Sequence, residues 1–150
     1  MRIDAQKTRA SQLNRSVSNT MNDNLSQFKK VCREAFQFLI ENYGFHELNG
    51  LHPRHTNQYQ VRFGNDKIEI LILGEGYGTI ADIEYVTTDG IEVATQMLEP
   101  DWEPLKKRRK IKKAMPSQAD QIIMAAARIK ERDKDILQGN LNRLNKAADR

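Results

Sequence analysis

The sequence predicts an α+β fold in which an amino-terminal amphipathic helix packs on an antiparallel meander sheet of four or five strands and a carboxy-terminal helix follows. Two observations carry this prediction. Over residues 24–43 the apolar residues recur every three or four positions, as on one face of a helix. Over residues 58–97 apolar and polar residues alternate between short clusters of turn-forming residues, as in strands with one buried face.

The amino-terminal helix is the most clearly marked element. Asn22, Asp23 or Asn24 can cap its start, and Gly44 stands where a left-handed residue commonly ends a helix. Its buried stripe has eight members: Leu25, Phe28, Val31, Cys32, Ala35, Phe36, Leu39 and Ile40. We therefore expect Cys32 to be a buried thiol rather than a reactive one.

Five segments carry the strand pattern: residues 45–49, 58–63, 67–73, 80–85 and 91–97. A loop over residues 50–55 contains Pro53 and separates the first two strands. Three clusters supply the later turns: residues 64–66, 74–78 and 88–90. In the fourth strand, alternation places Asp82 and Glu84 on the outward face.

Composition divides the chain into four parts: a flexible polar tail (1–22), the α+β domain (23–104), a basic linker (105–116) and the carboxy-terminal helix (117–150). We expect Trp102 to pack where Pro100 and Pro104 close the sheet region. The last helix has only a partial apolar stripe, interrupted by Arg132 and Asp133. It therefore resembles a long, exposed helix more than a core one.

Charge is distributed unevenly along the 150 residues, whose formal net charge is +4. Residues 1–30 carry six basic and two acidic side chains, residues 31–100 carry four and eleven, and residues 101–150 carry fourteen and seven. An acidic body is thus flanked by basic ends. The predicted sheet has the wrong sign for binding a phosphate backbone.

Two segments invite a catalytic or cofactor interpretation, and neither supports it. In residues 74–78 the third glycine comes too early for a dinucleotide loop, and a strand rather than a helix follows. His52 and His55 lie in a proline-containing loop, and neither Cys32 nor His46 completes a metal-binding spacing. No nucleophile motif is present, so we expect no enzyme activity, no cofactor and no metal.

Membrane association is not expected, since no apolar run approaches the length of a bilayer span and the first residues lack a signal-peptide pattern. One cysteine excludes a disulfide within the chain. These features favour a cytoplasmic location. The oligomeric state is left open.

Binding is the function that the charge pattern favours. Six residues form the candidate partner surface, on the outward sheet face and at its rims: Glu69, Glu75, Asp82, Glu84, Asp89 and Glu92. Carboxylates on a rigid sheet can attract a basic protein partner. The alternative is nucleic-acid binding by the basic run Lys106, Lys107, Arg108, Arg109, Lys110, Lys112 and Lys113.

The order of helix, Tyr43-Gly44-Phe45, the segment Gln60-Val61-Arg62-Phe63-Gly64-Asn65, an apolar strand and a hairpin resembles a group of small bacterial α+β proteins. Many of that group are considered immunity proteins of polymorphic or contact-dependent toxin systems. The resemblance covers residues 25–103 and implies binding of a cognate toxin, often a basic nuclease. A secretion-chaperone-like adaptor, which holds an extended segment in an apolar groove, is the other protein-binding interpretation.

Overall fold

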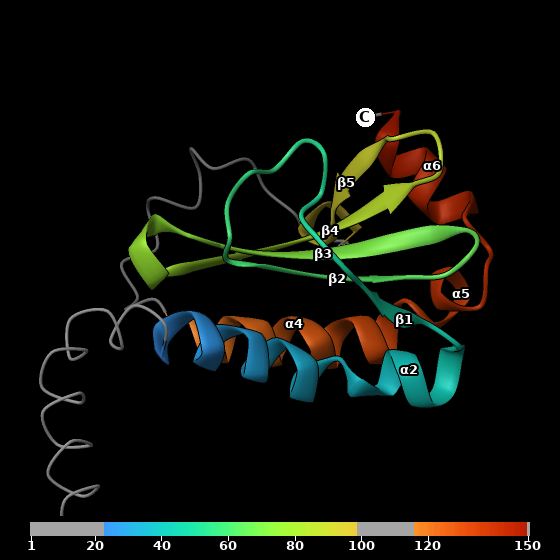
Figure 1. The fold of residues 1–150 in the computed structure, drawn as a ribbon. Coiled ribbons are helices and arrows are strands. Elements are labelled where there is room, and N and C mark those ends of the chain that lie inside the picture. Colours follow the sequence, from blue (N-terminus) through green and yellow to red (C-terminus); the bar gives the residue numbers. More distant parts are fainter. Residues whose placement is uncertain (1–22, 99–115, 150) are drawn as a thin grey trace, which may run out of the picture.

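The computed structural model describes residues 23–98 and 116–149, which form an α+β structure (Figure 1). The predicted α+β class and the antiparallel sheet are confirmed. The polar tail, Trp102 and the basic run of residues 106–113 lie outside the described residues.

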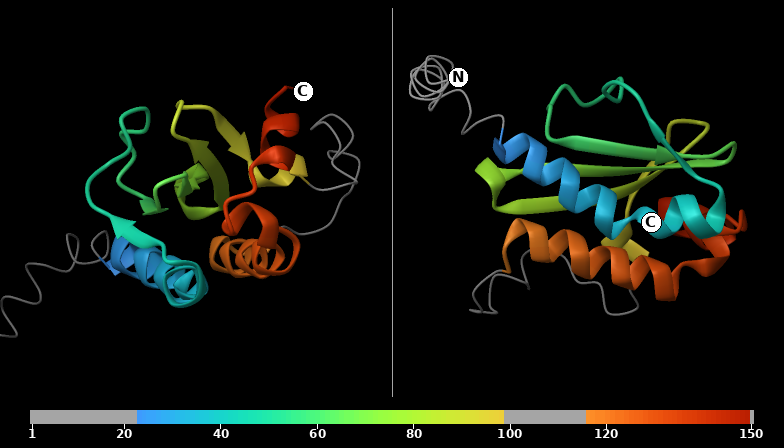
Figure 2. Two further views of the ribbon diagram at one scale, coloured as in Figure 1. Left: turned by 90° about the vertical axis from the view of Figure 1, so that its right-hand side faces the viewer. Right: turned by 60° about the horizontal axis from the view of Figure 1, so that its bottom comes forward.

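Helices from the two ends of the described chain lie side by side on one face of the sheet (Figures 1 and 2). Residues 23–35 are helical, and after a break at Phe36 the helix continues as α2 (Gln37–Tyr43). Gly44 ends it with a φ of 72° and an N–H that donates to the carbonyl of Leu39, as the glycine position predicts. The neighbouring helix is α4 (Gln118–Arg132).

The sheet is a simple antiparallel meander whose strands neighbour one another in chain order. Its members are β1 (His46–Leu48), β2 (Gln60–Gly64), β3 (Ile68–Glu75), β4 (Ile80–Thr87) and β5 (Glu92–Ala94). In the centre, Leu71 of β3 is opposite Arg62 on β2 and Glu84 on β4. The glycine-rich turn η1 (Gly76–Gly78) connects β3 directly to β4, as predicted for a turn between two strands.

The two faces of the sheet are covered differently. The inner face packs on the helices through large side chains that are fully buried: Phe36, Leu39, Phe63, Ile70, Ile72, Tyr85, Ile122 and Ile129. The opposite, outer face carries a smaller buried cluster of Leu71, Leu73 and Val86. There the loop of residues 49–59 passes over the strands in place of a helix (Figure 1).

The prediction of one long, exposed carboxy-terminal helix is wrong. The carboxy-terminal region contains α4, the single-turn helix α5 (Lys134–Leu137) and α6 (Asn142–Ala148). Ile122, Ala126 and Ile129 of α4 are buried against the sheet. The short helix α6 contacts β5 and the turn η2 (Thr95–Leu98), so this region completes the core.

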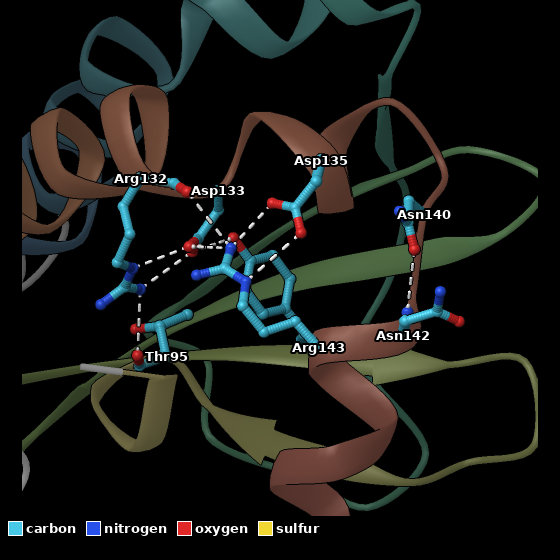
Figure 3. Close-up of polar contacts among 8 residues, drawn as sticks. Thr95, Arg132, Asp133, Asp135, Asn140, Asn142 and Arg143 are labelled. Atoms are coloured by element: carbon cyan, nitrogen blue, oxygen red, sulfur yellow. Dashed lines mark hydrogen bonds and ion pairs between the residues drawn. The ribbon is translucent and has the colours of Figure 1, made fainter. Parts of the chain in front are cut away.

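A buried carboxylate holds these helices to the sheet (Figure 3). Asp133, between α4 and α5, is fully buried and accepts hydrogen bonds from Tyr85 Oη at 2.7 Å and from the guanidinium groups of Arg132 and Arg143. Arg132 also donates to the carbonyl of Thr95 at 3.1 Å. Two guanidinium groups and one phenol hydroxyl thus donate to the buried carboxylate, which satisfies its charge as burial requires.

None of the described helices has the length and apolar character needed to cross a bilayer.

Candidate functional site

Four carboxylates gather on the outer face, and we call them the carboxylate cluster: Glu75, Asp82, Glu84 and Glu92. Asp82 and Glu84 alternate with the buried residues of β4, so both point away from the helices. Glu75 ends β3 and Glu92 begins β5, the strands on either side of β4. The cluster therefore extends across three adjacent strands.

Glu84 and Glu92 form the more buried half of the cluster. The pKa of Glu84 is raised to about 7, first by burial and then by the charge of Glu92 and a hydrogen bond to it. Glu84 Oε2 and Glu92 Oε1 are both buried, and neither receives a hydrogen bond from the residues that the structure describes. Buried carboxylate oxygens normally accept such bonds, so these two acceptors are left without a donor among the described residues.

Glu75 and Asp82 form the more exposed half. Their hydrogen bond is the main reason that the pKa of Glu75 is raised, with burial and the charge of Asp82 adding to it. The charge of Asp82 also contributes to the raised pKa of Glu84. The charges of the two acid pairs therefore influence each other, and the four carboxylates form one cluster of negative charge.

Gln60 fixes the loop of residues 49–59 above the outer face. Its side-chain amide is buried on β2, donates to the carbonyls of His55 at 2.8 Å and Asn57 at 2.6 Å, and accepts the N–H of His52 at 2.8 Å. One side chain thus satisfies three backbone groups that the crossing of the sheet would otherwise leave unpaired. Asn57 adds a 2.6 Å hydrogen bond to the carbonyl of Gly74.

This loop brings imidazole groups to the carboxylates. His55 Nε2 lies 3.4 Å from Glu92 and 4.0 Å from Glu84 Oε2. His52 is buried beside it, with the two ring centroids 5.4 Å apart. At the exposed margin, Arg54 Nη1 is 3.9 Å from Glu92 Oε1. The side-chain ligand atoms of His52, His55 and Glu92 all lie within 4.8 Å of one another.

The six predicted partner residues divide into two groups in the structure. Four of them form the carboxylate cluster. Glu69 lies on the same face, but Arg62 pairs with both of its oxygens, at 2.8 and 3.1 Å, and thereby neutralises it. Asp89 is exposed in the turn between β4 and β5. The alternative nucleic-acid residues, Lys106 to Lys113, lie outside the described residues.

A separate cleft of about 810 Å³ opens at the end of the sheet near η1. Its apolar walls include Phe28, Val31, Tyr59 and Ile122, and amide side chains such as Gln118 line its rim. Of its described lining residues only Glu75 is charged. The cleft and the carboxylate cluster therefore meet at Glu75 but differ in chemistry.

The outer face combines acceptor groups with imidazole groups in a fixed arrangement. Carboxylates that lack donors can bind a guanidinium or ammonium group, and carboxylates beside imidazoles can bind a metal ion. Sequence reasoning found the carboxylates but not His52, His55 or Gln60 as their neighbours. The sequence signal that could have revealed these neighbours is the polar composition of the loop between β1 and β2, two strands that pair directly.

Comparison of the chain with protein-family models, curated proteins and solved structures finds no match.

Proposed function

We propose that the protein is a binding protein whose carboxylate cluster receives basic side chains of a partner protein. In this proposal the partner is a basic toxin domain, and the protein neutralises it by occupying its cationic surface. The resemblance to immunity proteins of toxin systems points in the same direction.

One observation carries the proposal: the carboxylate cluster extends across three adjacent strands, and its more exposed half, Glu75 and Asp82, can be reached from solvent. An arginine side chain of a partner could supply donors to both carboxylates at once, because its guanidinium presents several N–H groups in one plane. The strands of the meander already hold the two acceptors in place, so little order would have to be gained on binding.

Capture of a partner from extracts of the source cells tests the proposal, with the purified full chain as bait. The changed bait carries Glu75→Gln and Asp82→Asn, which remove two charges from the exposed half of the cluster. We expect the original chain to retain a stoichiometric basic protein at low salt, and the changed chain to bind it at least about 10-fold more weakly, since close charge pairs at interfaces contribute over 1 kcal/mol each.

The matched control carries Glu34→Gln and Glu41→Gln, which remove the same charge from the exposed surface of the helices. It should bind like the original chain. Glu69 is left unchanged because Arg62 already neutralises it. Equal retention of the partner by all three baits would refute the acidic-face proposal.

The adaptor function is the second candidate, because the cleft near η1 offers apolar walls for an extended segment. Binding there would resist high salt and survive the single change Asp82→Asn, because Asp82 is not among the residues that line the cleft. Recovery of nucleic acid that is lost at high salt, with no protein retained, would instead favour the basic run of residues 106–113.

A further inference from the structure

We infer that His52, His55 and Glu92 form a binding site for a divalent transition-metal ion, with Zn²⁺ the best-fitting ion and Glu84 the available fourth ligand. This inference does not depend on the proposed partner. The sequence predicts no metal site, because the two histidines lie in a proline-containing loop and neither Cys32 nor His46 completes a metal-binding spacing. The folded loop brings them to Glu92 of β5.

The distances suit a small tetrahedral ion. Zinc–ligand bonds of about 2.0–2.1 Å place neighbouring ligand atoms about 3.4 Å apart in a tetrahedron. His55 Nε2 lies 3.4 Å from Glu92, and the ligand atoms of His52, His55 and Glu92 are all within 4.8 Å of one another. Small side-chain rotations would close the remaining gap.

Charge balance gives a second, independent reason. Glu84 Oε2 is 4.0 Å from His55 Nε2 and is one of the two buried oxygens that receive no hydrogen bond from the described part of the chain. A divalent cation between Glu84 and Glu92 would neutralise both carboxylates while two neutral imidazoles complete its coordination. The mixed imidazole and carboxylate donors favour Zn²⁺ over Mg²⁺ or Ca²⁺, which prefer oxygen ligands alone.

His52 would have to change its hydrogen bonding to bind the ion. The N–H of Arg54 donates to His52 Nδ1 at 3.1 Å, so the proton of a neutral His52 ring sits on Nε2. Coordination through either nitrogen therefore displaces this contact or moves the proton. Losing this hydrogen bond offsets part of what His52 contributes to metal binding. We therefore expect His55 and Glu92 to dominate the affinity and His52 to add to it.

Gln60 acts as the positioning residue of this site. It bonds to the backbone of both His52 and His55 and thereby holds the two imidazoles over the sheet. Hydrogen bonds to the ligand side chains themselves typically contribute 10- to 100-fold to metal affinity, and bonds to the ligands' backbone should contribute less. Gln60→Ala should therefore weaken metal binding although Gln60 offers no ligand within the proposed set.

The experiment uses the full chain, freed of metal with a chelator and then titrated with Zn²⁺ by calorimetry and with Co²⁺ by visible absorption. We expect one ion per chain, an intense tetrahedral Co²⁺ spectrum, and no thiolate-to-metal band because Cys32 is buried elsewhere. His55→Ala and the isosteric Glu92→Gln should each weaken binding at least about 10-fold. At one Zn²⁺ concentration, the rise in Tm should be larger for the original chain than for either variant.

His46→Ala is the matched control, because His46 is the remaining histidine and lies exposed on β1. It should bind Zn²⁺ like the original chain, and circular dichroism should show that each variant is folded. Absence of a stoichiometric ion, equal binding by the Glu92→Gln variant, or equal loss in His46→Ala would overturn the inference. The Glu75→Gln and Asp82→Asn chain keeps every proposed ligand, so failure of partner binding and failure of metal binding are separately visible.

Discussion

Cys32 lies in the core between the amino-terminal helix and the sheet, and its side chain is fully buried. Burial raises its pKa to about 12, against smaller opposing effects from Arg33 and the backbone. At pH 8 only ~1 thiol in 10⁴ would carry the reactive negative charge, by the usual pH dependence of a thiol. The residue is therefore a packing group.

We predict that Cys32 of the native protein does not react with iodoacetamide at pH 8 within an hour, whereas the chain unfolded in guanidinium reacts completely. Mass spectrometry counts the added groups. Glutathione in the same tube serves as the control for active reagent. Rapid labelling of the native chain would mean that the helix of residues 23–35 opens from the sheet far more readily than its packing indicates.

Two residues, Arg132 and Asp133, explain why the prediction for the carboxy-terminal helix failed. In the sequence, Arg132 and Asp133 interrupt the last apolar stripe, and this interruption predicts an exposed helix. In the structure Asp133 continues the buried side of α4, since Ile122, Ala126 and Ile129 precede it at helical spacing. Arg132 is adjacent in sequence, but the other partners, Tyr85 and Arg143, lie 48 and 10 residues away, so no local pattern could reveal that this buried charge is fully satisfied.

At the scale of elements, regular strands were predictable and their cross-connections were not. Alternation located β2, β3 and β4, because a one-face-buried strand imposes a period of two. It also placed Asp82 and Glu84 on the outer face. The meeting of His55 with Glu92 depends on how the loop of residues 49–59 folds over the sheet, which depends on the buried amide of Gln60. The carboxylates of the candidate site were therefore predictable from the sequence, and the histidines beside them were not.

Gly74 marks the closest approach between elements. An added Cβ there would lie 2.9 Å from Gln118 Nε2, 3.0 Å from Phe28 Cε2 and 3.2 Å from Tyr59 Cβ. These atoms belong to α4, the amino-terminal helix and the loop that leads into β2. The absence of a side chain at this one position lets three elements pack on the end of β3.

We predict that Gly74→Ala lowers the free energy of unfolding by about 2 kcal/mol, because overpacking forces the neighbouring side chains apart. Urea unfolding followed by circular dichroism measures it. Gly44→Ala is the comparison, since its φ is 72° but nothing lies within 4 Å of the added carbon. That variant should lose about 1 kcal/mol, from left-handed backbone strain alone. A smaller loss for Gly74→Ala than for Gly44→Ala would contradict the packing argument.

At the scale of the whole molecule, Asp133 joins the carboxy-terminal helices to the sheet. Burial alone would raise its pKa, but hydrogen bonds from Arg132, Tyr85 and Arg143 and the charge of Arg132 outweigh burial and hold the pKa below its usual range. The folded state therefore releases this proton more readily than the unfolded state does. The resulting stabilisation is complete above the unfolded pKa of about 4 and is lost as pH falls through the folded pKa.

We predict that Asp133→Asn lowers the free energy of unfolding by about 3 kcal/mol at pH 7, because it leaves Arg132 and Arg143 without their shared carboxylate. The difference from the original chain should shrink as the pH falls from about 4 toward the lowered folded-state pKa of Asp133, because the unfolded chain takes up this proton first. Urea unfolding at pH 7, 5 and 3 measures both quantities. Asp66→Asn, at an exposed turn position, should change stability by less than about 0.5 kcal/mol at each pH. A deficit in the Asp133→Asn chain that is the same at pH 3 and pH 7 would mean that shape rather than charge makes Asp133 stabilising, and that the arginines bind the sheet without it.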